Sequence, residues 1–166
     1  MLQLCIKRFI VLDEINLQLK GIKGWLLLMC VSMTILDPFS ILFNLAIMTD
    51  MLKPHFNKNA GLLKMLLING MFSIGLALFS IYAGLSLWKI LPRAVNTAKK
   101  YLLAISLYSV FSLFIPSLIN LEKESAGNIS GNNLLNSMLT ILYAFAWYMY
   151  LKKSKRIKLT YGSNLE

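Results

Sequence analysis

An acidic residue, Asp37, lies in the middle of a long apolar stretch and is followed directly by Pro38. A carboxyl group in a membrane interior costs about 3 kcal/mol or more unless it is neutral or paired, so this residue is the first candidate for chemistry. In a continuous helix it shares one face with polar residues at steps of three and four. These are Cys30, Thr34, Ser40 or Ile41, and Asn44. The pattern predicts a polar stripe that faces other helices and not lipid.

Three interpretations of Asp37 are open from the sequence. It binds a proton, a cation or a polar substrate group, or it is a neutral, hydrogen-bonded acid at a kinked helix crossing. In the third interpretation the helix breaks and Asp37 caps a new segment, because proline is favoured in a first helical turn. Pro38 also lacks an N–H and frees a carbonyl one turn back, for which Thr34 offers a hydroxyl.

Candidate polar partners for Asp37 lie in two later apolar segments, at Asn69 and Asn136. Asn69 begins a stripe of mostly small residues at helical spacing, which lets helices approach closely. This stripe continues through Ser73, Ala77, Ser80 and Gly84. No second acid or base lies in the middle of an apolar segment, so the sequence does not predict a charged relay of the kind used by many pumps.

Four apolar segments must position these residues. The chain is 57% hydrophobic and only 14% charged, whereas soluble domains are about 25% charged. The segments run over residues 24–49, 62–91, 101–121 and 134–151. Each has roughly the 18 or more residues that a helix needs to cross a membrane. Because strand-like alternation is absent, we predict an all-α fold, an integral membrane four-helix bundle.

The basic residues predict how the bundle is oriented. The net charge is +10. Thirteen Lys and Arg residues fall on one side of the four predicted spans and four on the other. Lys and Arg in short loops stay cytoplasmic, so both termini are predicted to be cytoplasmic. This asymmetry, with Trp25 and Trp88 at the same predicted interface, indicates contact with anionic lipid headgroups and argues against nucleic acid.

The predicted organisation has three parts. Residues 1–23 form a cytoplasmic or interfacial arm, residues 24–151 form the membrane domain, and residues 152–166 form a basic cytoplasmic tail. The gaps between spans are predicted as connections, including a polar loop over residues 122–133 that is rich in Gly, Ser and Asn.

Catalytic and metal-binding patterns are not evident. The single histidine, His55, and the two cysteines, Cys5 and Cys30, do not stand at metal-ligand spacing. No Ser-His-Asp set or phosphate-binding loop is present, so we expect neither an enzyme nor a bound cofactor or metal.

Three motifs carry a family resemblance. They are "GIKGWL" at residues 21–26, "WKILPR" at 88–93 and "SKRIKLTY" at 154–161. In their order and position the chain resembles the bacterial four-span membrane proteins of the domain of unknown function 2569 family. The resemblance implies an inner-membrane location and no established activity. It marks as motif residues Gly21, Gly24, Trp25, Pro92, Arg93, Ser154, Arg156 and Thr160.

Two functions follow as expectations. All three motifs lie on the predicted cytoplasmic face, so the first is a non-enzymatic membrane module that binds a partner protein or a lipid there. The second is a small transporter or a subunit that conducts ions or protons by means of Asp37. A polar cavity shared by Asp37 with Asn69 or Asn136 would favour transport. A dry, packed Asp37 would favour the binding module.

Overall fold

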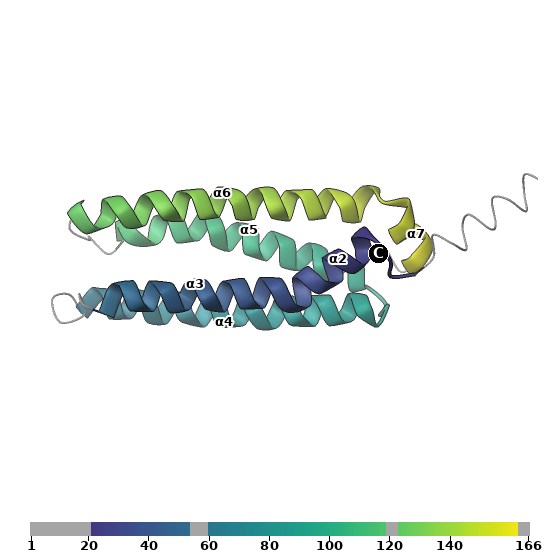
Figure 1. The fold of residues 1–166 in the computed structure, drawn as a ribbon, viewed down its shortest axis with the longest axis horizontal. Coiled ribbons are helices and arrows are strands. Elements are labelled where there is room, and N and C mark those ends of the chain that lie inside the picture. The colour runs from purple at the N-terminus through teal and green to yellow at the C-terminus, as the bar shows by residue number, and fades with distance from the viewer. Residues whose placement is uncertain (1–20, 54–59, 119–122, 163–166) are drawn as a thin grey trace, which may run out of the picture.

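A computed structural model of the chain describes residues 21–53, 60–118 and 123–162 (Figure 1). The predicted arm over residues 1–23 falls almost entirely outside the described residues. The elements are α2 (Trp25–Val31), the π-helical turn η1 (Ser32–Leu36), α3 (Asp37–Leu52), α4 (Ala60–Trp88), α5 (Ala94–Leu118), α6 (Lys123–Lys153) and α7 (Lys155–Tyr161). The described fold is therefore all-α, as predicted.

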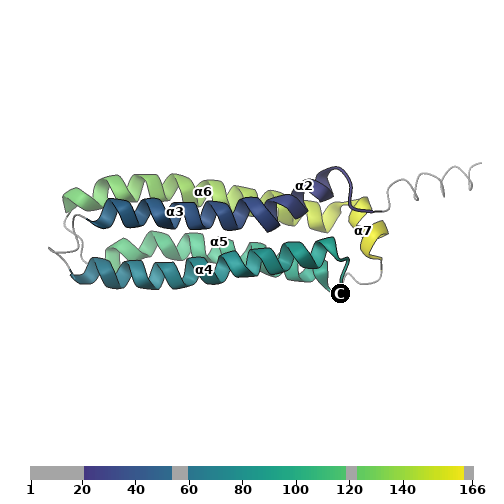
Figure 2. The same ribbon diagram turned by 60° about the horizontal axis from the view of Figure 1, so that its bottom comes forward.

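Four long rods form the body of the molecule, and the first rod is the continuous run of α2, η1 and α3. The α3 helix lies beside α4, α4 beside α5, and α5 beside α6 (Figures 1 and 2). The short α7 helix lies across one end of the rods, next to the start of α2. We call this end, where α2 begins and α7 packs, the α7 end.

Three helices are long and apolar enough to cross a membrane, within the described residues. They cover Trp25–Asp50, Leu62–Trp88 and Leu134–Lys153. These agree with three of the four predicted spans and identify a multi-pass membrane protein. The remaining predicted span, 101–121, coincides with α5 up to Leu118 and then leaves the described residues. Large exposed apolar side chains such as Met71 (76% exposed) fit a lipid-facing surface.

The buried core is concentrated toward the α7 end. Its members come from every described rod and from α7, among them Leu26, Met29, Met33, Leu87, Val95, Tyr101, Leu151 and Ile157. The contacts of Ile157, which is fully buried, show that α7 belongs to this core although it follows the last span. The end of the bundle that carries the sequence motifs is therefore the packed end.

Two connections differ in length from their predicted bounds. The link between α4 and α5 is residues 89–93 only. Its second residue, Ile90, has φ 48°. Ile90 N donates to Leu87 O, and Leu91 N donates to Ser86 O. These two hydrogen bonds form a Schellman motif, and Pro92 follows it because proline cannot continue the helix.

The α6 helix begins at Lys123, so the predicted loop over residues 122–133 is largely helical. Ser, Asn and Gly each weaken a helix by less than about 1 kcal/mol. Extending an existing helix adds one hydrogen bond for each residue fixed, which offsets such a penalty. The apolar part of α6, from Leu134, agrees with the predicted span.

Candidate functional site

The first rod passes Asp37 without a break. The residues around it are helical, with Asp37 at φ −63° and ψ −53°, and its side chain makes no capping bond to the backbone. The interpretation in which Asp37 caps a new segment is therefore wrong. Instead, the rod widens into a π-helical turn over Ser32–Leu36, and α2 leaves the line of α3 at this turn (Figure 1).

The π-helical turn and Pro38 together leave one carbonyl without a backbone donor. In this turn an N–H bonds the carbonyl five residues back, as Asp37 N does to Ser32 O. The next bond would join residue 38 to Met33 O, but Pro38 has no N–H. Ser80 Oγ on α4 donates to Met33 O instead, at 2.7 Å and buried. A neighbouring helix thus replaces the missing bond.

Thr34 was predicted to bond a carbonyl freed by Pro38. Its hydroxyl instead donates to Cys30 O at 2.6 Å, within the preceding turn. The carbonyl left open by the proline belongs to Met33 and is bonded by Ser80.

Asp37 joins three rods through hydroxyl groups. Tyr101 Oη on α5 donates to Asp37 Oδ2 at 3.0 Å. Tyr143 Oη on α6 lies 2.8 Å from Asp37 Oδ1 and 3.1 Å from Ser32 Oγ. Ser32 Oγ in turn donates to Met29 O at 2.9 Å. We call these five residues, Met29, Ser32, Asp37, Tyr101 and Tyr143, the Asp37 cluster.

Aromatic packing orients both tyrosines of the cluster. Phe79 meets Tyr101 edge to face, with ring centroids 5.8 Å apart, and Trp147 meets Tyr143 in the same way at 6.2 Å. Such pairs have a preferred geometry that limits ring movement. The hydroxyls are therefore held at Asp37 by rigid neighbours.

The predicted polar stripe does not continue past Asp37. Asn44 is exposed and its amide donates to Ser40 O of its own helix at 2.8 Å, so it does not face the bundle. Beyond Pro38 no residue of α3 with a described side chain is buried, because the packed core lies toward the α7 end.

Asn69 and Asn136 do not reach Asp37. Asn69 belongs to a separate cluster, in which the Tyr108 hydroxyl donates to Asn69 Oδ1 and also lies 3.1 Å from Ser73 Oγ. Asn136 is exposed, and its carbonyl accepts from Thr140 in the next turn. Asp37, Asn69 and Asn136 therefore do not form the shared polar cavity that would favour transport.

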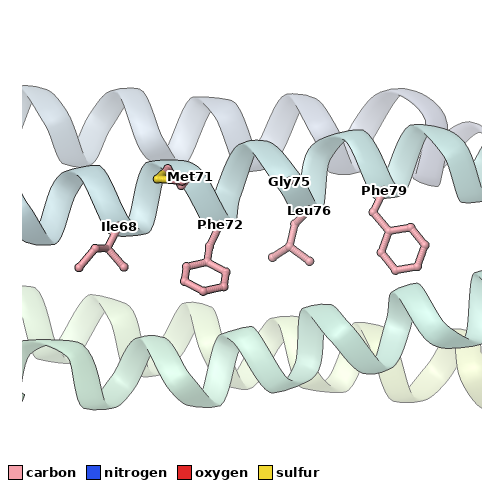
Figure 3. A pocket seen from close by; sticks show the side chains of 6 residues that line it. All are labelled: Ile68, Met71, Phe72, Gly75, Leu76 and Phe79. Atoms are coloured by element: carbon pink, nitrogen blue, oxygen red, sulfur yellow. The ribbon is translucent and has the colours of Figure 1, made fainter.

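The cavity shown in Figure 3 is apolar. Its volume is about 470 Å³ and its lining comes from α4 alone, with side chains that extend toward the α5–α6 pair. The lining residues are Ile68, Met71, Phe72, Gly75, Leu76 and Phe79. None of the predicted intramembrane polar residues lines it.

At the α7 end hydrogen bonds join the first and the last sequence motif, and also join the last motif to the residue before "WKILPR". Gly21 N donates to Thr160 Oγ1 at 3.1 Å, and the Arg156 guanidinium donates to Lys23 O. Tyr161 Oη donates to Leu87 O at 2.8 Å, in buried surroundings, one residue before "WKILPR". We call these residues the end cluster. These contacts bring the first and the last motif side by side.

Glycine is required at the entry to α2. Gly21 and Gly24 have φ of 114° and 60°, a region that side chains disfavour. A Cβ at Gly24 would lie 3.1 Å from Arg156 Nη1. The second glycine therefore lets the arginine reach the backbone of the first motif.

The other motif residues lie at the rim of the α7 end. Trp25 is 69% exposed and Pro92 is exposed. Arg93, also exposed, precedes α5 with φ 66°, and its carbonyl accepts the first helical bond from Thr97. Ser154 has extended backbone and links α6 to α7 without a side-chain cap. These residues shape the connections and do not enter the end cluster.

Basic side chains surround the end cluster. Lys and Arg residues at this end, in the described part of the chain, are Lys23, Lys89, Arg93, Lys99, Lys100, Lys152, Lys153, Lys155, Arg156 and Lys158. The acids whose side chains the structure describes lie elsewhere, with Asp37 inside the bundle and Asp50 near the opposite end, where it pairs with Lys53. The α7 end therefore carries a strongly positive surface.

Sequence reasoning missed the tyrosines. Neither Tyr101 nor Tyr143 is among the partners predicted for Asp37, yet both contact it. A tyrosine ring can extend its hydroxyl several ångströms from its helix, so helical spacing alone does not show where that hydroxyl lies. The signal that was available is chemical. A lone buried carboxyl group needs hydrogen-bond donors, and tyrosine hydroxyls in the other apolar segments can supply them.

Comparison with known proteins gives one result. The profile of the family described as "Protein of unknown function (DUF2569)" matches residues 19–162. Neither a curated protein nor a solved structure matches the chain. The matched range begins just before Gly21 and ends just after Tyr161, so it includes all three sequence motifs and the end cluster.

Proposed function

We propose that this chain, which belongs to the DUF2569 family, is a non-enzymatic membrane module that binds anionic lipid headgroups at its α7 end. The α7 end is proposed to be cytoplasmic, in a bacterial inner membrane. One observation carries the proposal: the end cluster joins three distant segments into a packed surface that is surrounded by basic residues.

The topology proposal rests on length and charge. Three described helices are long and apolar enough to span, and α5 lies between α4 and α6 as a fourth rod. Basic residues flank the rods at the α7 end, and such residues remain cytoplasmic when loops are short. Four spans with both termini cytoplasmic account for the arrangement of rods and charges together.

Position favours lipid headgroups over a protein as the partner. Lys152 and Lys153 end α6 and Lys89 follows α4 directly, so their ammonium groups lie where an apolar helix leaves the membrane. Each basic residue at that level contributes about 1 kcal/mol of attraction to anionic lipid. Trp25 and Trp88, which are 69% and 41% exposed, lie at the same level, where amphipathic rings are favoured.

The test measures lipid retention. The protein is reconstituted in vesicles with or without anionic phospholipid, purified, and examined by native mass spectrometry for bound lipid. Replacing Lys152 and Lys153 by Gln should lower retention of anionic lipid, because these exposed residues make no described internal hydrogen bond. The matched control replaces Lys53 and Lys64, at the opposite end.

Equal loss in both variants, or no preference for anionic lipid in the wild type, would contradict the proposal. A protein that co-purifies from native membranes and depends on the same lysines would identify a protein partner in place of lipid.

A transporter or proton-conducting subunit that uses Asp37 is the second candidate. The chain of hydroxyls from Asp37 through Tyr143 to Ser32 favours it. Asn69 and Asn136, which would extend a polar path, lie apart from that chain. Proton flux into proteoliposomes that is the same for wild type and Asp37→Asn would remove this candidate.

A further inference from the structure

The Asp37 cluster contains a carboxyl group without a counter-charge. Asp37 makes no ion pair with any described residue. The groups that face it are Tyr101 from α5, Tyr143 from α6 and, through Tyr143, Ser32 of the π-helical turn. A carboxylate inside a membrane needs a partner of opposite charge or must be neutral. Hydroxyl groups supply no such charge.

The oxygen atoms of the cluster form four short contacts. Tyr101 Oη to Asp37 Oδ2 is 3.0 Å and Asp37 Oδ1 to Tyr143 Oη is 2.8 Å. Tyr143 Oη to Ser32 Oγ is 3.1 Å and Ser32 Oγ to Met29 O is 2.9 Å. Each contact needs one proton between its two oxygens to be a hydrogen bond.

The hydroxyl groups supply only three protons. Tyr101, Tyr143 and Ser32 carry one each, and the Met29 carbonyl carries none. With an ionised Asp37, one of the four contacts therefore has two oxygens facing each other without a proton. Ser32 would have to release Met29 O, or Tyr143 would have to release Ser32.

We propose that Asp37 binds a proton on Oδ1 and holds it as a neutral carboxylic acid at neutral pH. The acid donates to Tyr143, Tyr143 donates to Ser32, and Ser32 donates to the Met29 carbonyl. Tyr101 donates to the other carboxyl oxygen. All four contacts then hold one proton each, and every hydroxyl donates once.

In this arrangement the proton on Asp37 completes a hydrogen-bond chain that stabilises the bend in the first rod. The hydrogen-bond chain starts on α3, passes through α6 and ends on a carbonyl of α2, so it connects the two sides of the π-helical turn. Loss of the proton removes one link and introduces a charge at the same point. The inference is independent of lipid binding at the α7 end.

The test is infrared spectroscopy of the whole protein in vesicles at pH 7. A protonated carboxyl has a carbonyl stretching band that ionised carboxylates lack. We expect this band in the wild type. It should shift to lower frequency when the protein is made with aspartate that carries carbon-13 in its side-chain carboxyl group. The labelled wild type needs no variant, so the result does not depend on the folding of any variant.

Two substitutions and a control assign the band. It should disappear in Asp37→Asn and remain in Asp50→Asn, whose carboxylate is exposed and paired with Lys53. In Tyr143→Phe it should move to higher frequency, because the acid loses its acceptor. A wild type without an aspartate-derived band would overturn the proposal. So would a band that survives Asp37→Asn, or one unchanged by Tyr143→Phe.

Discussion

Gly84 lies where α4 crosses the π-helical turn, and we expect Gly84→Ala to destabilise the protein. An added Cβ would lie 2.4 Å from Thr34 Cγ2, 3.0 Å from Thr34 N and 3.2 Å from Met33 C. Rotation of the threonine can relieve only the first contact, because the other two are with backbone. The turn must therefore move away from α4, which also stretches the bond from Ser80 to Met33 O.

The expected cost is that of overpacking a tight contact, about 1–3 kcal/mol. This corresponds to a decrease of roughly 5- to 150-fold in the ratio of folded to unfolded protein. The measurement is reversible unfolding in a fixed detergent mixture, followed by helix content. Gly75→Ala on the same helix is the matched control, because nothing lies within 4 Å of its added Cβ. Without a clash, alanine should stabilise α4 by up to about 1 kcal/mol.

A second substitution separates side chain from backbone. Thr34→Ser removes Cγ2 and should restore only part of the stability lost in Gly84→Ala, because the backbone contacts remain. Unchanged stability in Gly84→Ala, or complete recovery in the double variant, would refute the close approach of the two backbones.

Three further outcomes are expected. Ser80→Ala should cost about 1–3 kcal/mol in unfolding free energy, because a buried carbonyl loses its donor; Ser86→Ala should cost less, since Ser86 bonds only a carbonyl of its own helix. Asp37→Asn should unfold close to wild type, whereas Asp37→Leu should lose several kcal/mol with its hydrogen bonds. Burial raises the pKa of the Tyr161 phenol above its ordinary value of about 10. Its stabilisation should be complete below pH 10 and decline above it, and Tyr161→Phe should make the alkaline decline in thermal melts smaller.

The sequence predicted the helical class and the membrane spans because both follow from composition and segment length. The apolar runs of the first, second and last rods agree with the described helices to within a few residues. The same reasoning placed the motif residues near one end, since charge asymmetry and span order are properties of the chain alone. These features depend little on which side chains meet.

The details of the Asp37 cluster depend on contacts between rods, which spacing does not show. The π-helical turn and Pro38 left the Met33 carbonyl for Ser80 to bond. Tyr101 reaches Asp37 from α5, and residue spacing alone does not predict that α5 lies beside Asp37. A helix irregularity and a long aromatic side chain each changed the site while leaving the fold class intact.

The seven-residue α2 helix is held at both ends, and this predicts that its two attachments are coupled. The end cluster fixes the chain before α2 through Thr160, and the Asp37 cluster fixes its last turn through Ser32. In a double-mutant cycle, Thr160→Val and Ser32→Ala should interact by more than about 0.5 kcal/mol, which distant independent sites do not.

Ser137→Ala provides the control partner for Thr160→Val in this cycle. Ser137 Oγ donates to Ser109 O between α6 and α5 and does not involve α2. This pair should be additive, because no short element connects the two sites. If the Ser32 pair is equally additive, α2 does not transmit strain, and the two clusters act as separate attachments. Interaction in the first cycle alone would mean that the Asp37 cluster and the end cluster are coupled through α2.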